Sequence, residues 1–115
     1  MEIGIDIEKN ERFKNLSERV MNRAFTKSER EFAMRFKNYH EHLCAFWCVK
    51  EATVKAFSNL KINYQDIEIT ANSEGKPYII KNDTIKKELE KIGATDIKIS
   101  ISHSKDYATA VCLIY

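Results

Sequence analysis

Two acidic side chains near the N-terminus are spaced for binding a cation. Asp6 and Glu8 belong to an alternating stretch, so both carboxylates project from one face of an extended chain with Cα atoms about 6.5–7 Å apart. Carboxylates this close repel each other unless a cation lies between them, and hard cations prefer oxygen ligands. Gly4 on the same face leaves room for a ligand. The alternative is an acidic edge strand that faces solvent.

The segment 47–56 holds a second set of charged side chains beside an apolar helix face. Lys50 falls in the middle of a stripe of apolar residues at helical spacing, and charged side chains are seldom buried unless paired or coordinated. Glu51 and Lys55 share a neighbouring row, where the alternative is a surface pair worth about 0.3–0.5 kcal/mol. Adjacent Lys and Glu at the edge of a buried face are unusual for a purely structural helix.

Two further groups of side chains are candidates for binding anions. Arg12, Arg19 and Arg23 fall close to one line of a predicted helix, and arginines in a row suit carboxylates or phosphates. An ordinary solvated helix face has the same appearance. His103 stands between two serines and close to Lys105, and all three residue types can donate to a phosphate. A neutral histidine in a turn is the other interpretation.

The composition sets limits on the class of protein. A chain of 115 residues, 43% hydrophobic and 31% charged, predicts one globular domain over residues 1–115. The net charge of +2 gives no strong attraction to nucleic acid or to a membrane surface. No apolar run reaches the roughly 20 residues that span a bilayer, and the N-terminus does not resemble a signal peptide. We therefore expect a cytoplasmic protein with neither nucleic-acid nor membrane partners.

The first half of the chain predicts one strand and three helices. Residues 2–8 form a strand whose apolar back consists of three isoleucines. Asn10 caps a helix with Phe13, Leu16 and Val20 inward. A capping box, Thr26-x-x-Glu29, begins the next helix, whose inner side carries Phe32, Ala33 and Phe36. The central helix runs from about residue 41 to 58.

The second half predicts two hairpins around a short helix. Extended segments at 64–70 and 76–80 flank a polar turn, and Asn82-Asp83 caps a helix that Gly93 ends. Ile85, Leu89 and Ile92 form the inner side of this helix. Strands at 97–101 and 107–115 complete the chain. This order predicts an α+β fold with a largely antiparallel sheet and a cluster of helices.

These motifs together resemble the 4′-phosphopantetheinyl transferase superfamily. The length and the order of the motifs are similar to its short bacterial type, the holo-[acyl-carrier-protein] synthases, over nearly the whole chain. The stretches that carry the resemblance are Gly4-Ile5-Asp6-Ile7-Glu8, Phe25-Thr26-x-x-Glu29, Trp47-x-x-Lys50-Glu51-Ala52-x-x-Lys55-Ala56, Asp66-Ile67-Glu68-Ile69, Gly75-Lys76-Pro77 and Ile101-Ser102-His103-Ser104-x-x-Tyr107-Ala108.

The resemblance implies an activity and a metal. The family transfers the phosphopantetheine arm of coenzyme A to a serine of apo acyl carrier protein, a step in fatty acid biosynthesis, with Mg²⁺. Asp6 and Glu51 resemble its metal ligands, with Glu8 as a third. Lys50 and Lys55 match basic residues that would bind coenzyme A and stabilise the leaving phosphate. Two candidates for the proton acceptor remain, namely Glu51 and a water bound to the metal.

The resemblance also implies partners and an assembly. His103 matches the histidine that contacts the 3′-phosphate of coenzyme A. Arg12, Arg19 and Arg23 match a docking surface for the acidic carrier protein. The short members are homotrimers with active sites between subunits.

The sequence departs from the family pattern at two points. The residues after the central helix read Phe57-Ser58-Asn59-Leu60-Lys61 where many short members have a Gly-Thr-Gly loop. Asp6-Ile7-Glu8 is similar to the acidic pair of the larger, two-lobed branch, which uses both acids on the metal. Two other classes stay open: another carboxylate–magnesium enzyme acting on phosphate esters, and a non-catalytic module that binds coenzyme A or a carrier protein.

Overall fold

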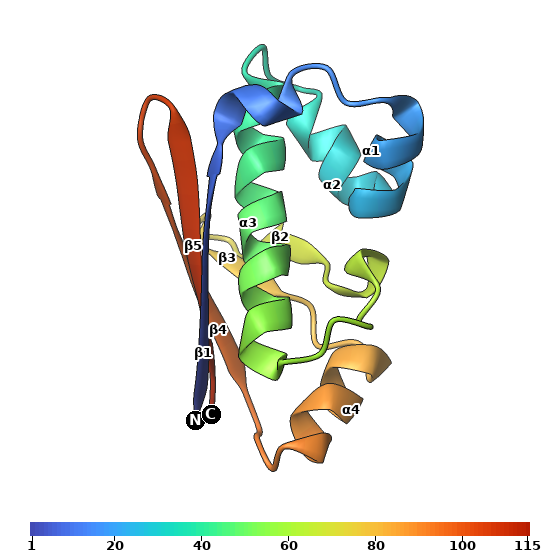
Figure 1. Cartoon of the computed structure of the whole chain (residues 1–115), viewed down its shortest axis with the longest axis vertical. Coiled ribbons are helices and arrows are strands. Elements are labelled where there is room, and N and C mark those ends of the chain that lie inside the picture. Colours follow the sequence, from blue (N-terminus) through green and yellow to red (C-terminus); the bar gives the residue numbers. More distant parts are fainter.

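A three-stranded sheet, a long central helix and an outer group of short helices make up the molecule (Figure 1). The computed structural model describes all residues, 1–115. In chain order the elements are β1 (Glu2–Lys9), the 3₁₀ helix η1 (Asn10–Phe13), α1 (Glu18–Ala24), α2 (Lys27–Ala33), α3 (Tyr39–Phe57), the 3₁₀ helix η2 (Tyr64–Asp66), β2 (Ile69–Ala71), β3 (Pro77–Ile79), α4 (Asp83–Lys91), β4 (Ile97–His103) and β5 (Tyr107–Ile114).

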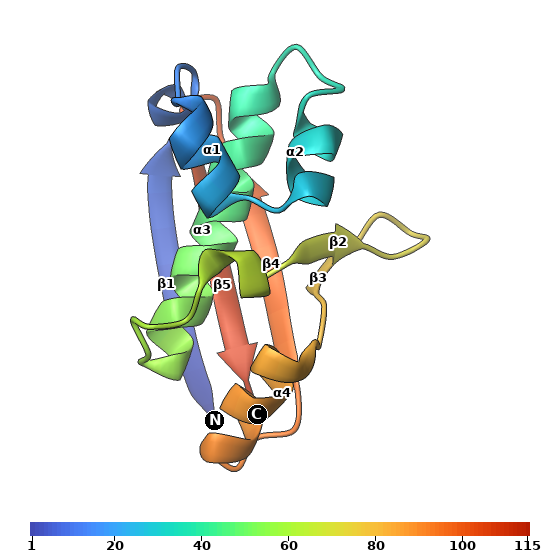
Figure 2. The same ribbon diagram turned by 90° about the vertical axis from the view of Figure 1, so that its right-hand side faces the viewer.

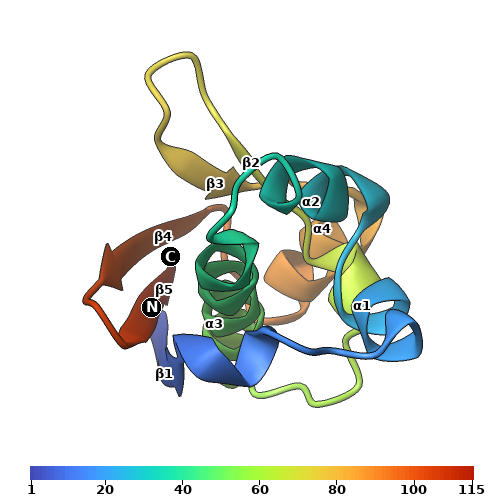
Figure 3. The same ribbon diagram turned by 90° about the horizontal axis from the view of Figure 1, so that it is seen from above.

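The main sheet has the strand order β1-β5-β4 and is antiparallel throughout. The helix α3 lies along one face of this sheet, and α1, α2 and α4 lie on the far side of α3 (Figures 1 and 3). The short hairpin β2–β3 projects beside β4 as a separate antiparallel pair (Figure 2). The predicted α+β class with a largely antiparallel sheet is confirmed. No helix combines the length and apolar composition that crossing a membrane requires.

The contact between β1 and α3 is unusually close because Gly4 has no side chain. A Cβ placed on Gly4 would lie 1.9 Å from the carbonyl oxygen of Ala52 and 2.7 Å from the amide nitrogen of Ala56. Small residues continue this interface on the neighbouring strand, where Ala108 and Ala110 are buried against the helix. The room at Gly4 is therefore filled by the backbone of α3, not by a ligand as the sequence suggested.

The orientation of β1 is the reverse of what its alternation suggested. The side bearing Gly4 and Asp6 packs on α3, whereas Ile3, Ile5 and Ile7 are exposed by 66, 65 and 61%. An alternating strand has one face for the core, and the close approach at Gly4 decides which face that is. The apolar back of β1 therefore points away from the core of the chain.

The predicted first helix is two separate elements. Ser17 caps α1 through its hydroxyl, which accepts from the amide of Val20, and Val20 itself is exposed. Asn10 is buried and does not cap η1; its side-chain amide donates to the carbonyl of Lys105 at 3.2 Å. The side chain of Asn10 is therefore engaged outside the helix, and Ser17 supplies the cap of α1 instead.

Of the other local predictions, the capping box is confirmed, whereas two helix faces and one strand differ from what was expected. The capping box of α2 is confirmed, with Thr26 and Glu29 bonding reciprocally. The inner faces of α2 and α4 are shorter than predicted, because Phe32 on α2 is exposed and because Phe36 and Ile92, also exposed, lie beyond the ends of the two helices. The extended segment at 64–70 begins as a 3₁₀ helix and becomes a strand only at its end.

Candidate active site

A charged site lies between β1 and the exposed side of α3. Asp6 projects from β1 toward the helix, and its carboxylate oxygen Oδ1 accepts from Nζ of Lys55 at 3.1 Å. The same ammonium donates to the carbonyl of Ile5 at 2.9 Å. Asp6 is only 9% exposed, and its second oxygen, Oδ2, is buried without a hydrogen-bond partner. The structure thus brings Asp6 and Lys55, both predicted site residues, into direct contact.

Glu51 lies one turn before Lys55 on α3 and is held by a residue from outside the helix. The hydroxyl of Tyr64, in η2, donates to Oε1 of Glu51. Burial, this hydrogen bond and the charges of Glu51 and Asp6 raise the pKa of Tyr64 to about 12. The hydroxyl therefore stays protonated at neutral pH. The charges of both carboxylates contribute to the raised pKa of this one phenol group.

The donor set fits a hard divalent cation. A buried carboxylate oxygen without a partner is costly, and the free Oδ2 of Asp6 is such an atom. Mg²⁺ is commonly held by one or two carboxylates, with waters and substrate phosphates completing its shell. Asp6 and Glu51 are therefore the two residues of this site that would hold it.

Glu8 does not join these two carboxylates. Its side chain forms an ion pair with Arg12 one turn along the chain. No group of three His, Cys, Asp or Glu side chains is close enough to hold a metal ion. The structure therefore does not bring the three predicted carboxylates together, because Glu8 forms an ion pair with Arg12 instead.

Lys50 lies on the opposite side of α3, inside the protein. Its side chain is 0% exposed and ion-pairs with Oε1 of Glu29 at 2.9 Å. The ammonium also donates to the carbonyls of Tyr64 and Ile67 at 2.6 and 2.7 Å, so all three of its protons are used. Burial lowers the pKa of Lys50, and the carboxylate of Glu29 opposes that shift. In this position Lys50 cannot contact a ligand, which corrects the catalytic and coenzyme-binding roles expected for it.

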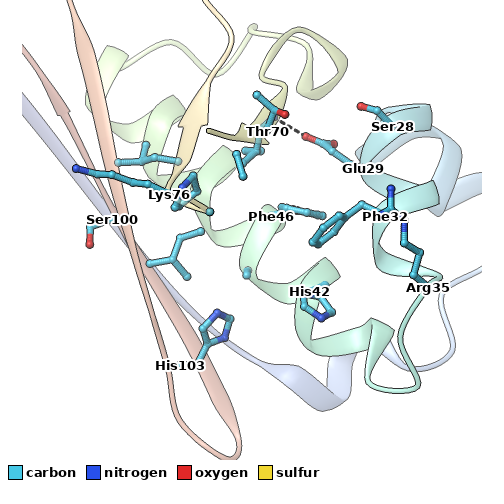
Figure 4. Close-up of a pocket in the computed structure, with 17 residues that line it drawn as sticks. Ser28, Glu29, Phe32, Arg35, His42, Phe46, Thr70, Lys76, Ser100 and His103 are labelled. Atoms are coloured by element: carbon cyan, nitrogen blue, oxygen red, sulfur yellow. Dashed lines mark hydrogen bonds between the residues drawn. The ribbon is translucent and has the colours of Figure 1, made fainter. Parts of the chain in front are cut away.

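A separate open cleft of about 640 Å³ lies on the other side of α3, bounded by α2, the β2–β3 hairpin and β4 (Figure 4). His103 borders it from the end of β4, and His42 from α3. Burial lowers the pKa of His42, and the positive charge of His103 adds to that shift. The cleft combines aromatic and basic side chains, namely Phe32, Phe46, Arg35, His42, Lys76 and His103.

The predicted arginine row is divided between two elements. Arg12 belongs to η1, whereas Arg19 and Arg23 lie one turn apart on α1. All three side chains are exposed. Arg19 and Arg23 remain available to an acidic partner, whereas Arg12 is ion-paired with Glu8, and the three do not form one line on one helix.

Tyr64 is the site residue that sequence reasoning did not identify. The alternation of its segment predicts a strand, in which a tyrosine is an ordinary residue. The sequence offered one clue, the position of Trp47 one helical turn before Glu51, because Tyr64 packs on Trp47 with ring centroids 4.9 Å apart. The partner of that row could not be assigned without the tertiary structure.

Comparison with known proteins places this arrangement in a family. The model of the 4′-phosphopantetheinyl transferase superfamily matches residues 2–112. This chain belongs to that superfamily.

Several relatives of this chain are named holo-[acyl-carrier-protein] synthase. The holo-[acyl-carrier-protein] synthase of Caldanaerobacter subterraneus subsp. tengcongensis is 37% identical over 116 residues, covering 96% of this chain and 91% of the relative. Two solved structures agree in fold. The Chronobacterium ammoniagenes ACPS–CoA complex has a TM-score of 0.82 and 29% identity, covering 98% of this chain and 95% of that one. The synthase of Bacillus anthracis in complex with CoA (3′,5′-ADP) has a TM-score of 0.81 and 29% identity, with coverage of 98% and 94%.

Proposed function

We propose that this chain is a holo-[acyl-carrier-protein] synthase formed by one domain over residues 1–115. It transfers the 4′-phosphopantetheine group of coenzyme A to a serine of an apo acyl carrier protein and releases adenosine 3′,5′-bisphosphate. The observation that carries the proposal is the set of Asp6, Glu51 and Lys55 between β1 and α3, in a chain 37% identical to a named synthase. The cytoplasmic location expected from the sequence is part of the proposal.

The residues of the site suit phosphoryl chemistry. Attack of a serine hydroxyl on a pyrophosphate needs positioning and neutralised charge on the phosphoryl oxygens. Mg²⁺ held by Asp6 and Glu51 would neutralise part of that charge. Lys55 uses two of its three N–H donors on the carbonyl of Ile5 and on Asp6, which leaves the third for a phosphoryl oxygen. Its half-exposed side chain is open to a substrate.

The direct test is to incubate the protein with coenzyme A, Mg²⁺ and an apo carrier protein and to weigh the carrier. The proposal expects the carrier to gain the mass of one phosphopantetheine group and adenosine 3′,5′-bisphosphate to appear. Release of inorganic phosphate from simple phosphate esters, with no change in the carrier, would favour the phosphohydrolase alternative. Binding without any mass change would favour the non-catalytic module.

A homotrimer with shared active sites is the second part of the proposal. His103, the expected contact for the 3′-phosphate, lies on β4, and Asp6 lies on β1, so the two belong to opposite edges of the sheet. A closed ring of subunits brings such distant positions together repeatedly without an open end. The exposed isoleucines of β1 adjoin the half-buried Val111 and Leu113 of β5, and a second copy of the chain is the occupant that would cover this apolar face.

Ile5→Lys is expected to break the assembly while leaving the fold of each chain intact. Ile5 is exposed at the middle of the outer face of β1, so a charge there would be buried only between subunits. Sedimentation at micromolar concentration is expected to give a trimer for the wild type and a monomer for this variant. Ile92→Lys changes an exposed isoleucine away from the sheet and is expected to stay trimeric. A monomeric wild type at that concentration would refute the trimer.

The docking of the carrier protein is proposed to use the arginines of η1 and α1. Arg19→Glu is expected to raise the KM for the carrier at least tenfold, about 1.4 kcal/mol, with little change in the KM for coenzyme A. Added salt should raise the KM of the wild type for the carrier toward that of the variant, because exposed charges are screened. Lys87→Glu on α4, at the opposite end of the molecule from α1, makes the same charge change and is the control (Figure 1). Equal losses for both substrates would oppose a docking role.

A further inference from the structure

The hydroxyl of Tyr64 has one partner, and that partner is a carboxylate of the proposed metal site. We propose that Tyr64 is a positioning residue that holds the Glu51 carboxylate ready for the divalent cation. The inference rests on the proposed role of Glu51 as a metal ligand. Tyr64 itself touches neither the metal nor the substrate in this assignment. It acts by hydrogen-bonding Oε1 of Glu51, which leaves Oε2 unengaged by the protein.

The turn that carries Tyr64 is fixed from the protein interior. Lys50 donates to the carbonyl of Tyr64 at 2.6 Å and to that of Ile67 at 2.7 Å, so its ammonium joins both ends of η2. The ion pair with Glu29 holds the ammonium in place, and both side chains are completely buried. Glu29 in turn accepts from the amide of Ile69 at 2.9 Å. A buried and fully paired cluster of this kind has few alternative arrangements.

A second anchor fixes the same turn from the other side. The side-chain amide of Gln65 donates to the carbonyls of Asn22 and Phe25, at 2.7 and 2.8 Å, at the end of α1. The side chain of Asn63 caps the turn by accepting from the amide of Gln65 at 2.9 Å. The ring of Tyr64 rests against Trp47, one turn before Glu51 on α3. Backbone, neighbouring side chain and ring thus all restrict where the hydroxyl can point.

A rigid hydroxyl matters because a glutamate side chain has several rotatable bonds. A free Glu51 would lose that freedom on binding a metal, and the Tyr64 bond removes part of the cost in advance. Partners that orient a metal ligand typically change metal affinity by about 10–100-fold when removed. Because Lys50 fixes the turn, this fully buried lysine serves the site indirectly, through the main chain of Tyr64.

Tyr64→Phe removes the hydroxyl and keeps both the ring on Trp47 and the carbonyl that Lys50 holds. Titration of the assembled protein with Mn²⁺, followed by the electron paramagnetic resonance signal of free Mn²⁺, measures affinity without any turnover. We expect at least about tenfold weaker binding. The Mg²⁺ concentration for half-maximal transfer should rise similarly, while the rate at saturating Mg²⁺ stays within about threefold of wild type, less than 0.7 kcal/mol. Melting temperatures of both proteins are measured in parallel without metal.

Two further variants make the outcomes distinguishable. Tyr78→Phe changes an exposed tyrosine on β3 and is expected to bind Mn²⁺ like the wild type. Glu51→Gln removes the proposed ligand itself. If Glu51→Gln weakens Mn²⁺ binding and Tyr64→Phe does not, the positioning role is overturned and the metal site stands. If Glu51→Gln also binds normally, the metal site itself is misplaced. A Tyr64→Phe variant that melts earlier but binds Mn²⁺ normally has lost only packing, which also overturns the inference.

Discussion

Glu51→Gln is expected to lower the rate of phosphopantetheine transfer at least about a hundredfold at saturating Mg²⁺. The substitution keeps the size of the side chain and an oxygen that can accept from Tyr64, and it removes the negative charge. Asp6→Asn should have a similar effect, because its free oxygen Oδ2 is the buried acceptor that the cation would satisfy. Mass spectrometry of the carrier at timed intervals gives the rate directly.

The loss should be specific to these two carboxylates. Glu90→Gln makes the same chemical change on the exposed surface of α4 and is expected to keep wild-type activity. Thermal unfolding of each variant shows whether a lost rate reflects lost structure. Near-wild-type turnover of either Glu51→Gln or Asp6→Asn at saturating Mg²⁺ would mean that the metal is bound elsewhere.

Gly4→Ala is expected to lower the free energy of unfolding by about 3 kcal/mol or more, because the new Cβ overpacks a rigid interface. The nearest atoms, 1.9 and 2.7 Å away, are the backbone carbonyl oxygen of Ala52 and amide nitrogen of Ala56. Neither can move aside without breaking α3 or separating it from β1. The total free energy of unfolding of a small domain is only about 5–15 kcal/mol. Urea denaturation should therefore show a large shift of the unfolding midpoint.

Gly75→Ala is the matched control for this effect. Gly75 has a φ of +82°, and a Cβ added there would have no atom within 4 Å, so only the backbone cost of about 1–2 kcal/mol applies. Similar midpoints for the two variants would mean that β1 and α3 separate easily. Gly4→Ala should also weaken metal binding, because Gly4 and Asp6 project from the same side of β1 toward α3.

The sequence by itself determined the family and the types of most elements, with the segments at 10–20 and 64–70 as the exceptions. Local signals decide these features: the capping box at Thr26 and Glu29, the helical period of α3, and the alternating isoleucines of β4 depend on neighbours within a few residues. The order of motifs along the chain carried the family resemblance, and the pairing of Asp6 with the helix bearing Glu51 and Lys55 followed from it. The α+β class then followed from the order of the elements.

Only the tertiary structure decided which faces and partners the charged residues have. Alternation in β1 defines two faces, but the missing side chain of Gly4 decides that the side with Asp6 meets α3 and the isoleucines point outward. A lysine in an apolar stripe is equally compatible with a ligand site and with a buried ion pair, and Glu29, on a different helix, makes Lys50 structural. Tyr64 reaches Glu51 from a turn whose position depends on that ion pair. Burial and long-range pairing depend on which elements meet in space, and that information is not contained in local spacing.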